Sequence, residues 1–271
     1  TLFCFILIAS LLVSGAVRII TEMTGAVDAL FSHAAAPDFV QMHTGEYDQG
    51  AIDAFAAQTP IVKAQQTVEM LNIDNANLSF AGHAPVENSV MENGFVRQNE
   101  AFDFLLDLDN QVVRPMDGEI AIPIYYLQRD GLAIGDTVTV SDGIFTKEFR
   151  IIAFVRDALM NPSLISSKRF VVSEADFHEL REHTGTDEYL IEFQLTEDAD
   201  VGEFERLYQG AGLPQKDTAV TGGLLKLMNA LTDGLVAALV ILVSLLLITV
   251  ALLCLRLILL ATLEEDIREI G

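Results

Sequence analysis

Basic residues are scarce in this sequence, which has 16 Lys and Arg against 39 Asp and Glu among 271 residues and a formal net charge of −23. The stretch from Ile19 to Lys226 holds 13 of the basic and 34 of the acidic residues. An acidic surface of this kind repels nucleic acid and anionic lipid head groups, so we predict no nucleic-acid partner. It would attract cationic peptides or divalent ions, although a solvated acidic surface without a ligand is the simpler interpretation.

Cysteine is almost absent as well. The two cysteines, Cys4 and Cys254, both lie in apolar segments, and the acidic middle of the chain has none. A disulfide framework is therefore excluded, and the middle must be stable through its own hydrophobic core, which about 200 residues can supply. This cysteine usage is compatible with an extracytoplasmic domain.

The sequence also lacks the motifs of common enzymes. It contains no Gly-x-Ser-x-Gly elbow, no Cys-His pairing and no Gly-x-x-x-x-Gly-Lys phosphate loop. We therefore predict a non-catalytic chain with no catalytic residues, no cofactor-binding residues and no cofactor of its own. If ATP and Mg²⁺ power the protein, a partner polypeptide binds them.

Metal-binding patterns are missing too. His178 to His183 reads His-Glu-Leu-Arg-Glu-His, but a helical His-Glu-x-x-His site needs its second histidine at the position of Glu182. Asp107 to Asn110 is similar to a calcium loop but lacks the central Gly and the closing Glu. We predict no metal site, a solvated helix face at the histidines and a turn at the aspartates.

Two long apolar runs are present. Leu235 to Leu255 has no charged residue and is followed by Arg256, which can reach lipid head groups. As a helix with a rise of about 1.5 Å per residue, it would cross the roughly 30 Å hydrocarbon core of a bilayer. A core helix of a large soluble protein is the alternative, but such helices seldom run so long without charge.

The other run, Leu2 to Val17, is uncharged but short for a full span. It is either a transmembrane helix without its first turn or a signal peptide, for which Ser14 and Ala16 have the spacing of a cleavage site. The two runs predict transmembrane helix 1 over 1–18, truncated at its start, and transmembrane helix 2 over 227–263. Two spans place both chain ends on the same side of the membrane.

The middle, 19–226, alternates strand-like and helix-like patterns, which predicts an α+β domain between the two transmembrane helices. The expected strands are Ile61–Leu71, Glu119–Ile124, Asp136–Val140, Phe145–Val155, Phe170–Val172 and Glu188–Leu195. Helices are expected over Asp48–Thr59, through Tyr126 and Leu127, over Ala175–His183 and over Val201–Tyr208. Ala101–Leu106 fits either a strand or a short helix.

The residues after Arg256 have a helical pattern of their own. Apolar side chains recur at intervals of three and four, with charged residues between them, at Leu260, Leu263, Ile267 and Ile270. The pattern predicts an amphipathic exit from the bilayer, and a plain juxtamembrane helix would show it as well.

Short motifs along the chain resemble those of one family. Thr262 to Gly271, which ends in Arg-Glu-Ile-Gly, resembles the passage with which FtsX/MacB-like permeases of ABC transporters follow their second span. Glu119–Pro123 and Leu132–Val140 are similar to that family's strand, short helix and Gly-Asp turn into the next strand. Phe149–Asp157 and Arg169–Ser173 resemble the two strands that follow. The resemblance covers the whole plan of the chain.

The resemblance implies a multi-pass protein of the bacterial plasma membrane, whose MacB-like periplasmic core domain between spans one and two is extracytoplasmic. It also implies that a separate or fused ABC-type ATPase docks on a cytoplasmic coupling segment, 264–271, where the FtsX-like permease domain begins, and the missing phosphate loop fits a separate subunit. The residues expected to couple to the ATPase are Asp266, Ile267, Arg268, Glu269, Ile270 and Gly271. The other expected partners are the lipid bilayer and a second copy of the permease or a homologous one.

We therefore expect the permease subunit of an ABC transporter complex, which couples ATP hydrolysis by its partner to movement of the extracytoplasmic domain, for export or mechanotransmission. The main alternative is a two-span sensor whose extracytoplasmic domain binds a ligand and whose tail feeds a signalling helix. A membrane-anchored enzyme is the third class, and the missing catalytic motifs argue against it.

Overall fold

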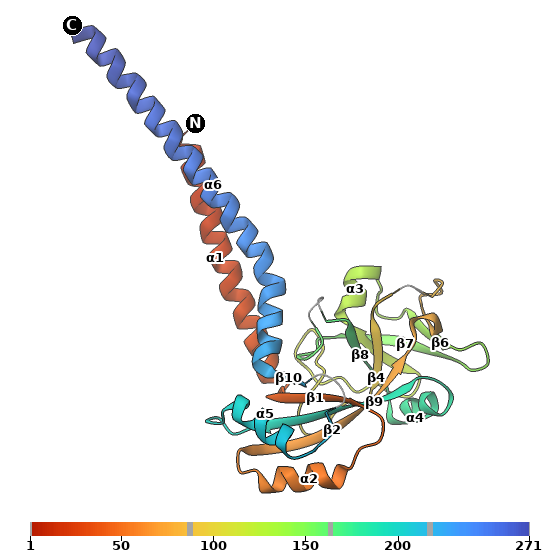
Figure 1. Ribbon diagram of the computed structural model, residues 1–271. Coiled ribbons are helices and arrows are strands. Elements are labelled where there is room, and N and C mark those ends of the chain that lie inside the picture. Colours follow the sequence, from red (N-terminus) through yellow and green to blue (C-terminus); the bar gives the residue numbers. More distant parts are fainter. Residues whose placement is uncertain (1, 86–88, 162–164, 216–218, 271) are drawn as a thin grey trace. The chain divides into compact units, whose positions relative to one another are not determined.

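The computed structural model describes residues 2–85, 89–161, 165–215 and 219–270 (Figure 1). The chain divides into two compact units, one made of residues 1–27 with 230–271 and the other of residues 28–229.

Two long helices run through the ends of the chain: α1 (Leu2–His33) and α6 (Gly222–Ile270). Their outer parts make up the first unit. Among the residues that the structure describes, we find no helical stretch long and apolar enough to cross a membrane. The transmembrane helices expected over 1–18 and 227–263 stay predictions.

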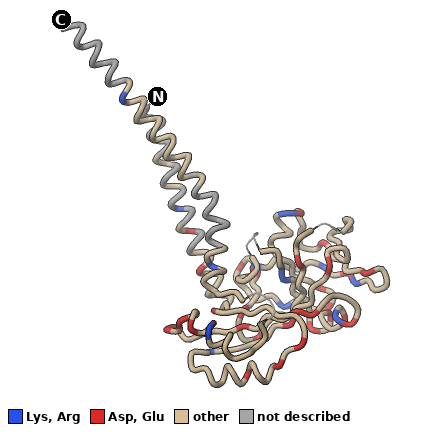
Figure 2. The backbone as a smooth tube through the Cα atoms, in the orientation of Figure 1, with Lys and Arg blue, Asp and Glu red and all other residues tan. Residues whose placement is uncertain are grey.

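The described residues of the second unit form ten strands. In chain order these are β1 (Phe39–Thr44), β2 (Val62–Ile73), β3 (Leu78–Phe80), β4 (Glu92–Val96), β5 (Glu119–Pro123), β6 (Thr137–Ser141), β7 (Thr146–Val155), β8 (Ser167–Val171), β9 (Thr186–Leu195) and β10 (Ala219–Thr221). The helices between them are α2 (Gln49–Gln58), the 3₁₀ turn η1 (Asn75–Asn77), α3 (Ile124–Asp130), α4 (Glu174–His183) and α5 (Val201–Gly210). The α+β class predicted for this part of the chain is confirmed. Its acidic residues are spread over the whole unit (Figure 2).

All ten strands belong to one sheet, in the order β10-β1-β9-β2-β4-β8-β5-β7-β6-β3. The pairs β4–β8 and β5–β7 are parallel, and the other pairs are antiparallel. Strand β2 joins two halves of this sheet, because most of its length pairs with β9 while its end, from Met70 to Ile73, pairs with β4.

The first half contains β10, β1, β9 and β2 with helices α2 and α5. Its two strand-helix-strand units, β1-α2-β2 and β9-α5-β10, interleave their strands in the split β-α-β arrangement. Phe39 and Phe193 from the sheet pack against Ile52 of α2 and Phe204 of α5 in one core. Successive residues of a strand point to opposite faces, so Glu192 of β9 projects to the face away from these helices.

The second half, with β3 to β8, is inserted between β2 and β9. Its core is rich in aromatic rings, and Phe95 of β4 stacks on Phe170 of β8 with ring centroids 5.0 Å apart. Tyr126 of α3 and Phe177 of α4 belong to the same core. Each half therefore has its own buried core, and the sheet is continuous through both.

Side-chain caps explain where the helices of the second unit begin. The carboxylate of Asp48 accepts a 3.1 Å hydrogen bond from the amide of Ala51 at the start of α2. At the start of α4, the hydroxyl of Ser173 accepts a 3.1 Å bond from the amide of Asp176. These N-cap residues satisfy backbone donors that the helix leaves free, and they are visible in the sequence.

Every strand and helix expected from the sequence in this unit is present, within a few residues of its predicted ends. The expectation for Ala101–Leu106 is wrong, because this segment is neither a helix nor a regular strand. Asp103 has a left-handed backbone with φ of 54°. The amides of Asp103 and Phe104 donate to the carbonyls of Ala35 and Ala34 at 3.1 and 2.8 Å. These hydrogen bonds to residues far away in the sequence replace the hydrogen bonds to a neighbouring strand that a regular strand would need.

Candidate functional site

The two long helices join the second unit at neighbouring strands. Helix α1 leads into β1 through residues 34–38, and α6 begins directly after β10. The strands β1 and β10 are antiparallel partners, with Phe39 opposite Thr221. The amide of Gly222 donates a 2.8 Å hydrogen bond to the carbonyl of Asp38, which extends the pairing by one step. We call this region, residues 28–38 with 221–226, the stem junction.

Gly222 lies where two backbones approach closely at the stem junction. A Cβ atom at this position would lie 3.0 Å from the carbonyl oxygen of Pro37 and 3.5 Å from Cα of Asp38. At Gly223, a Cβ would meet no atom within 4 Å. The Gly-Gly pair of the sequence therefore contains one glycine with a steric role and one without.

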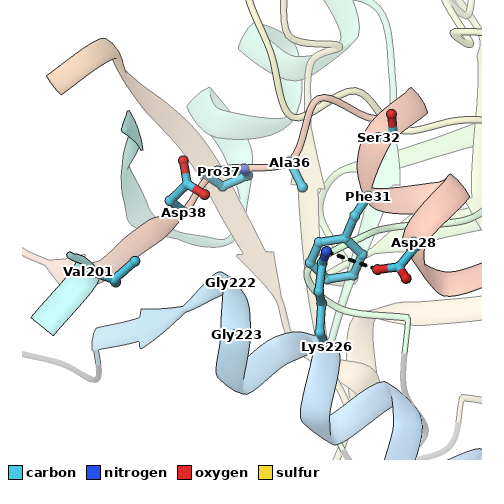
Figure 3. A pocket seen from close by; sticks show the side chains of 10 residues that line it. All are labelled: Asp28, Phe31, Ser32, Ala36, Pro37, Asp38, Val201, Gly222, Gly223 and Lys226. Carbon is cyan, nitrogen blue, oxygen red and sulfur yellow. Dashed lines mark hydrogen bonds and ion pairs between the residues drawn. The ribbon is translucent and has the colours of Figure 1, made fainter. Parts of the chain in front are cut away.

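A cavity of about 400 Å³ opens at the stem junction (Figure 3). Its lining consists of Asp28, Phe31, Ser32, Ala36, Pro37, Asp38, Val201, Gly222, Gly223 and Lys226. Lys226 Nζ lies 3.0 Å from Asp28 Oδ1 and 5.3 Å from the centroid of the Phe31 ring. Both charged side chains are about half exposed, so this ion pair contributes at most about 1 kcal/mol and is easily broken and remade.

The opposite side of residues 34–38 is fixed to the interior. Ala35 has φ of 49°, and its carbonyl accepts hydrogen bonds from Gln194 Nε2 of β9 at 2.8 Å and from the amide of Asp103. The carboxylate of Asp38 accepts a 2.8 Å bond from the amide of Leu195. One side of the junction is thus held by partly buried hydrogen bonds and the other by a half-exposed ion pair.

A second, smaller cleft of about 230 Å³ lies over β2 and β4. Its central cation, Arg97, bonds Glu69 at 2.5 Å and Glu174 at 2.7 Å. Another lining carboxylate, Glu100, lies 2.6 Å from Arg114. Because each of these charged side chains already has an ion-pair partner, the cleft is a bridge between the two halves rather than a site for a charged ligand.

The histidines of α4 do not come together. His178 Nε2 contacts Glu174 Oε1 at 2.9 Å, while the His183 ring lies against Phe145 at 4.4 Å. In the described part of the chain, no three His, Cys, Asp or Glu side chains are placed to hold a metal ion. The aspartate segment forms the expected turn, in which Asp107 accepts hydrogen bonds from the amides of Asp109 and Gln111, both at 2.8 Å.

The coupling residues expected from the sequence lie at the end of the chain. Residues 266–270 belong to α6, but their side chains lie outside the described residues, as does Gly271. Their role stays a prediction. The sequence did not single out the stem junction as a site, and its one visible signal was the Gly222-Gly223 pair.

Comparisons with known proteins add a weak structural likeness. No protein-family model matches the sequence, and no curated protein matches it. The structure is similar to the periplasmic region of MacB from Actinobacillus actinomycetemcomitans, with 11% identity, a TM-score of 0.37 and coverage of 70% of this chain and 91% of that one. It is also similar to a domain described as part of a permease protein from Porphyromonas gingivalis, with 12% identity, a TM-score of 0.38 and coverage of 66% and 83%.

One is described as a periplasmic region of MacB and the other as a domain of a permease, which are the kinds of protein that the sequence resemblance names. At these identities and TM-scores the likeness carries no argument about activity. The function must be inferred from the residues and geometry of this chain.

Proposed function

We propose that this chain is the membrane permease subunit of an ABC transporter complex and that its ten-stranded domain is moved by the two helices that enter it. The domain lies outside the cytoplasm, and the chain belongs to a bacterial plasma membrane. A separate ABC-type ATPase binds ATP and Mg²⁺. It docks on Asp266–Gly271, and a second permease copy or a homologous one completes the membrane part.

One observation carries this proposal: both helices attach to the same strand pair. Helix α1 continues into β1 and α6 starts from β10, and the Gly222–Asp38 hydrogen bond joins the two backbones where they meet. A movement of one helix along the other therefore acts first on the β1–β10 pair. The exposed Asp28–Lys226 ion pair is cheap to break, so it allows such a movement.

The paired charges of the domain favour a mechanical role over catalysis. The stem-junction cavity is lined by one ion pair, Asp28–Lys226, and by Asp38, whose carboxylate already accepts a hydrogen bond from the amide of Leu195. The acidic surface of the unit excludes anionic ligands, and the missing phosphate loop assigns ATP to another subunit. These features suit a chain that transmits movement of its helices to the ten-stranded domain.

The test is to lock the stem junction reversibly. Asp28→Cys with Lys226→Cys, in a Cys4→Ser and Cys254→Ser background, is cross-linked by a short reducible thiol reagent in the full-length permease with its ATPase. Locking should abolish ATP-dependent function while ATP binding persists, and a reductant should restore it. The control is Thr139→Cys with Glu148→Cys, directly opposite each other in β6 and β7. The same cross-linker there should leave function intact.

Full ATP-dependent activity of the locked junction would contradict the proposal. Failure of any ATPase to copurify, together with ligand-dependent signalling through the tail, would instead support the two-span sensor.

A further inference from the structure

A cluster of buried charged side chains lies on the face of the first half away from α2 and α5. Glu192 projects into it from the middle of β9 and is 0% exposed. Its Oε2 accepts a 2.7 Å hydrogen bond from Gln66 Nε2 of β2, whereas its Oε1 has no hydrogen-bond donor among the described residues. A fully buried carboxylate with an oxygen that accepts no hydrogen bond is costly in free energy, so the ionised form of Glu192 is disfavoured.

Gln66 Nε2, which bonds Glu192, also donates a 3.0 Å hydrogen bond to the carbonyl of Phe102, so the loop between β4 and β5 that carries the Asp103 carboxyl lies against Glu192. Asp103 is 0% exposed and pairs with Arg169 of β8 through bonds of 2.5 and 3.2 Å. Asn99 Nδ2 also donates to Asp103 Oδ2, at 3.3 Å. Burial and the negative charge of Asp103 raise the pKa of Glu192 well above its usual range, and a hydrogen bond to Asp103 acts in the same direction.

Arg169 ties the cluster to the second half of the sheet. It bonds Asp157 at 2.7 and 2.6 Å, in addition to Asp103. Burial opposes ionisation of Asp157, but Arg169 outweighs it and holds the pKa of this carboxyl below its usual value. The neighbouring Lys168 donates to the carbonyls of Met160 and Ile165 at 2.6 and 2.8 Å. Burial lowers the pKa of Lys168 to about 8, so this lysine is still mostly protonated at neutral pH.

Among the described residues, no cation is bonded to Glu192. Arg169 already pairs with both Asp103 and Asp157, and Lys168, the preceding residue of β8, donates to backbone carbonyls instead. An ionised Glu192 would add a third negative charge beside Asp103. Unpaired buried charge is among the most destabilising features in proteins, and two adjacent carboxyls commonly share one proton for this reason.

We propose that Glu192 carries a proton that it donates to the Asp103 carboxylate, and that this shared proton is a pH-sensitive latch on the stem junction. The backbone amides of Asp103 and Phe104 hold the carbonyls of Ala35 and Ala34, directly after α1. The proton therefore links the centre of β9 to the segment through which α1 enters the domain. The latch is independent of the proposed transport function.

Loss of the proton to solvent leaves two carboxylates facing each other. Glu192 cannot retreat, because β9 is paired with β1 on one side and β2 on the other. Asp103 lies on an irregular loop and can move away from Glu192. The loop then moves away and releases Ala34 and Ala35, which frees the end of α1. Raising the pH therefore opens the stem junction from inside the domain.

Infrared spectroscopy of the whole chain in detergent tests the proton directly. The wild type should show a protonated-carboxyl C=O band at neutral pH, and this band should disappear in Glu192→Gln and, in the wild type, on raising the pH. Glu188→Gln, on the same strand, is the control, because Glu188 bonds Asn72 at 2.9 Å outside the cluster. The control should keep the band.

Hydrogen exchange of the amides of Asp103 and Phe104 tests the latch. Corrected for the intrinsic rate, their opening in the wild type should increase by up to about tenfold per pH unit as the pH rises from the ordinary glutamate pKa of 4.5 towards the raised folded pKa, and it should level off above the folded pKa. In Glu192→Gln the opening should not depend on pH, because the amide NH₂ of glutamine replaces the acidic proton as a donor to Asp103. Glu188→Gln should behave as the wild type.

A band that persists in Glu192→Gln would overturn the proposal, and so would the same pH-dependent opening in that variant. Failure of Glu192→Gln to fold would overturn it as well, because glutamine reproduces the hydrogen bonds of the protonated acid. These outcomes do not involve an ATPase, so they are separate from failure of the transport proposal.

Discussion

The amide of Gly222 donates a 2.8 Å hydrogen bond to the carbonyl of Asp38. Asp38 belongs to the segment that connects α1 to β1, and Gly222 is the first residue of α6, directly after β10. The bond continues the ladder of β1 and β10, two strands that are far apart in the sequence. It places the entry and the exit of the domain at one edge of the sheet. A force applied through either helix is therefore received by the same pair of strands.

The two glycines at the start of α6 should respond differently to substitution. Gly222→Ala places a Cβ 3.0 Å from the Pro37 carbonyl, and we expect it to cost about 1 kcal/mol or more of unfolding free energy. Gly223→Ala meets no atom within 4 Å and should be neutral or gain up to about 1 kcal/mol. Urea unfolding followed by tyrosine fluorescence measures both, since all five tyrosines lie in the domain and the chain has no tryptophan. Equal effects would show that the backbone approach at Gly222 is unimportant.

Arg169 should be far more important for stability than an exposed arginine of the same sheet. Arg169→Met leaves Asp103 and Asp157 buried without their cation, and we expect a loss of about 3–5 kcal/mol. Arg150→Met removes only an ion pair with Glu119 in which the arginine is 59% exposed, and it should cost less than about 1 kcal/mol. The same urea titrations compare them. A small effect at Arg169 would mean that the cluster reorganises around its loss.

Asp157 should contribute to the acid sensitivity of the domain. Because the folded state holds the pKa of this carboxyl below its unfolded value of about 3.8, its stabilising effect is complete above that value and is lost as the pH falls through the folded pKa. The unfolding free energy of Asp157→Asn, measured between about pH 5 and pH 2, should therefore fall less steeply than that of the wild type. Asp109→Asn, in the exposed turn, should keep the wild-type slope. Identical slopes in both variants would remove Asp157 from the acid transition.

The end of α6 should be required for binding of the ATPase. Burial of Ile267 and Ile270 in a partner groove is worth roughly 1.5–3 kcal/mol each by area transfer, which is an upper bound once association costs are counted. Ile267→Asp with Ile270→Asp in the full-length permease should abolish copurification of the ATPase and leave membrane insertion intact. Reversing the charges of Arg268 and Glu269 should have a smaller effect that fades with salt. A double variant that keeps its ATPase and full function would contradict the coupling assignment.

Much of the domain was predictable because its signals are local. The hairpin of β6 and β7 follows from alternating apolar residues around Asp142-Gly143, and α4 follows from the Ser173 cap before a helical pattern. Burial of one face gives such segments a period that the sequence displays, whatever their neighbours are. The acidic charge, the absence of disulfides and the apolar runs are likewise properties of the sequence alone.

The site depended on the tertiary structure. Strand β10 has only three residues and pairs with β1 alone, and β1, although six residues long, is buried at successive positions without alternation, so no local period marks either strand. Ala101–Leu106 does not form the expected regular structure, because amides of this segment donate to the carbonyls of Ala34 and Ala35 and not to a neighbouring strand or a helical turn. Its partners lie far away in the chain, and local propensity cannot anticipate them.

The protonation of Glu192 was decided in the same way. The alternating pattern of β9 marks this residue as facing away from Ile191 and Phe193, which in a sheet with one wet face would place it in water. The loop that carries Asp103 lies against that face, and Glu192 is fully buried there. The sequence by itself determined that a carboxyl stands at this position of a strand. Only the tertiary structure decided that it is buried against a second carboxyl, because the free energy of a charge depends on the groups that surround it and not on its neighbours in the chain.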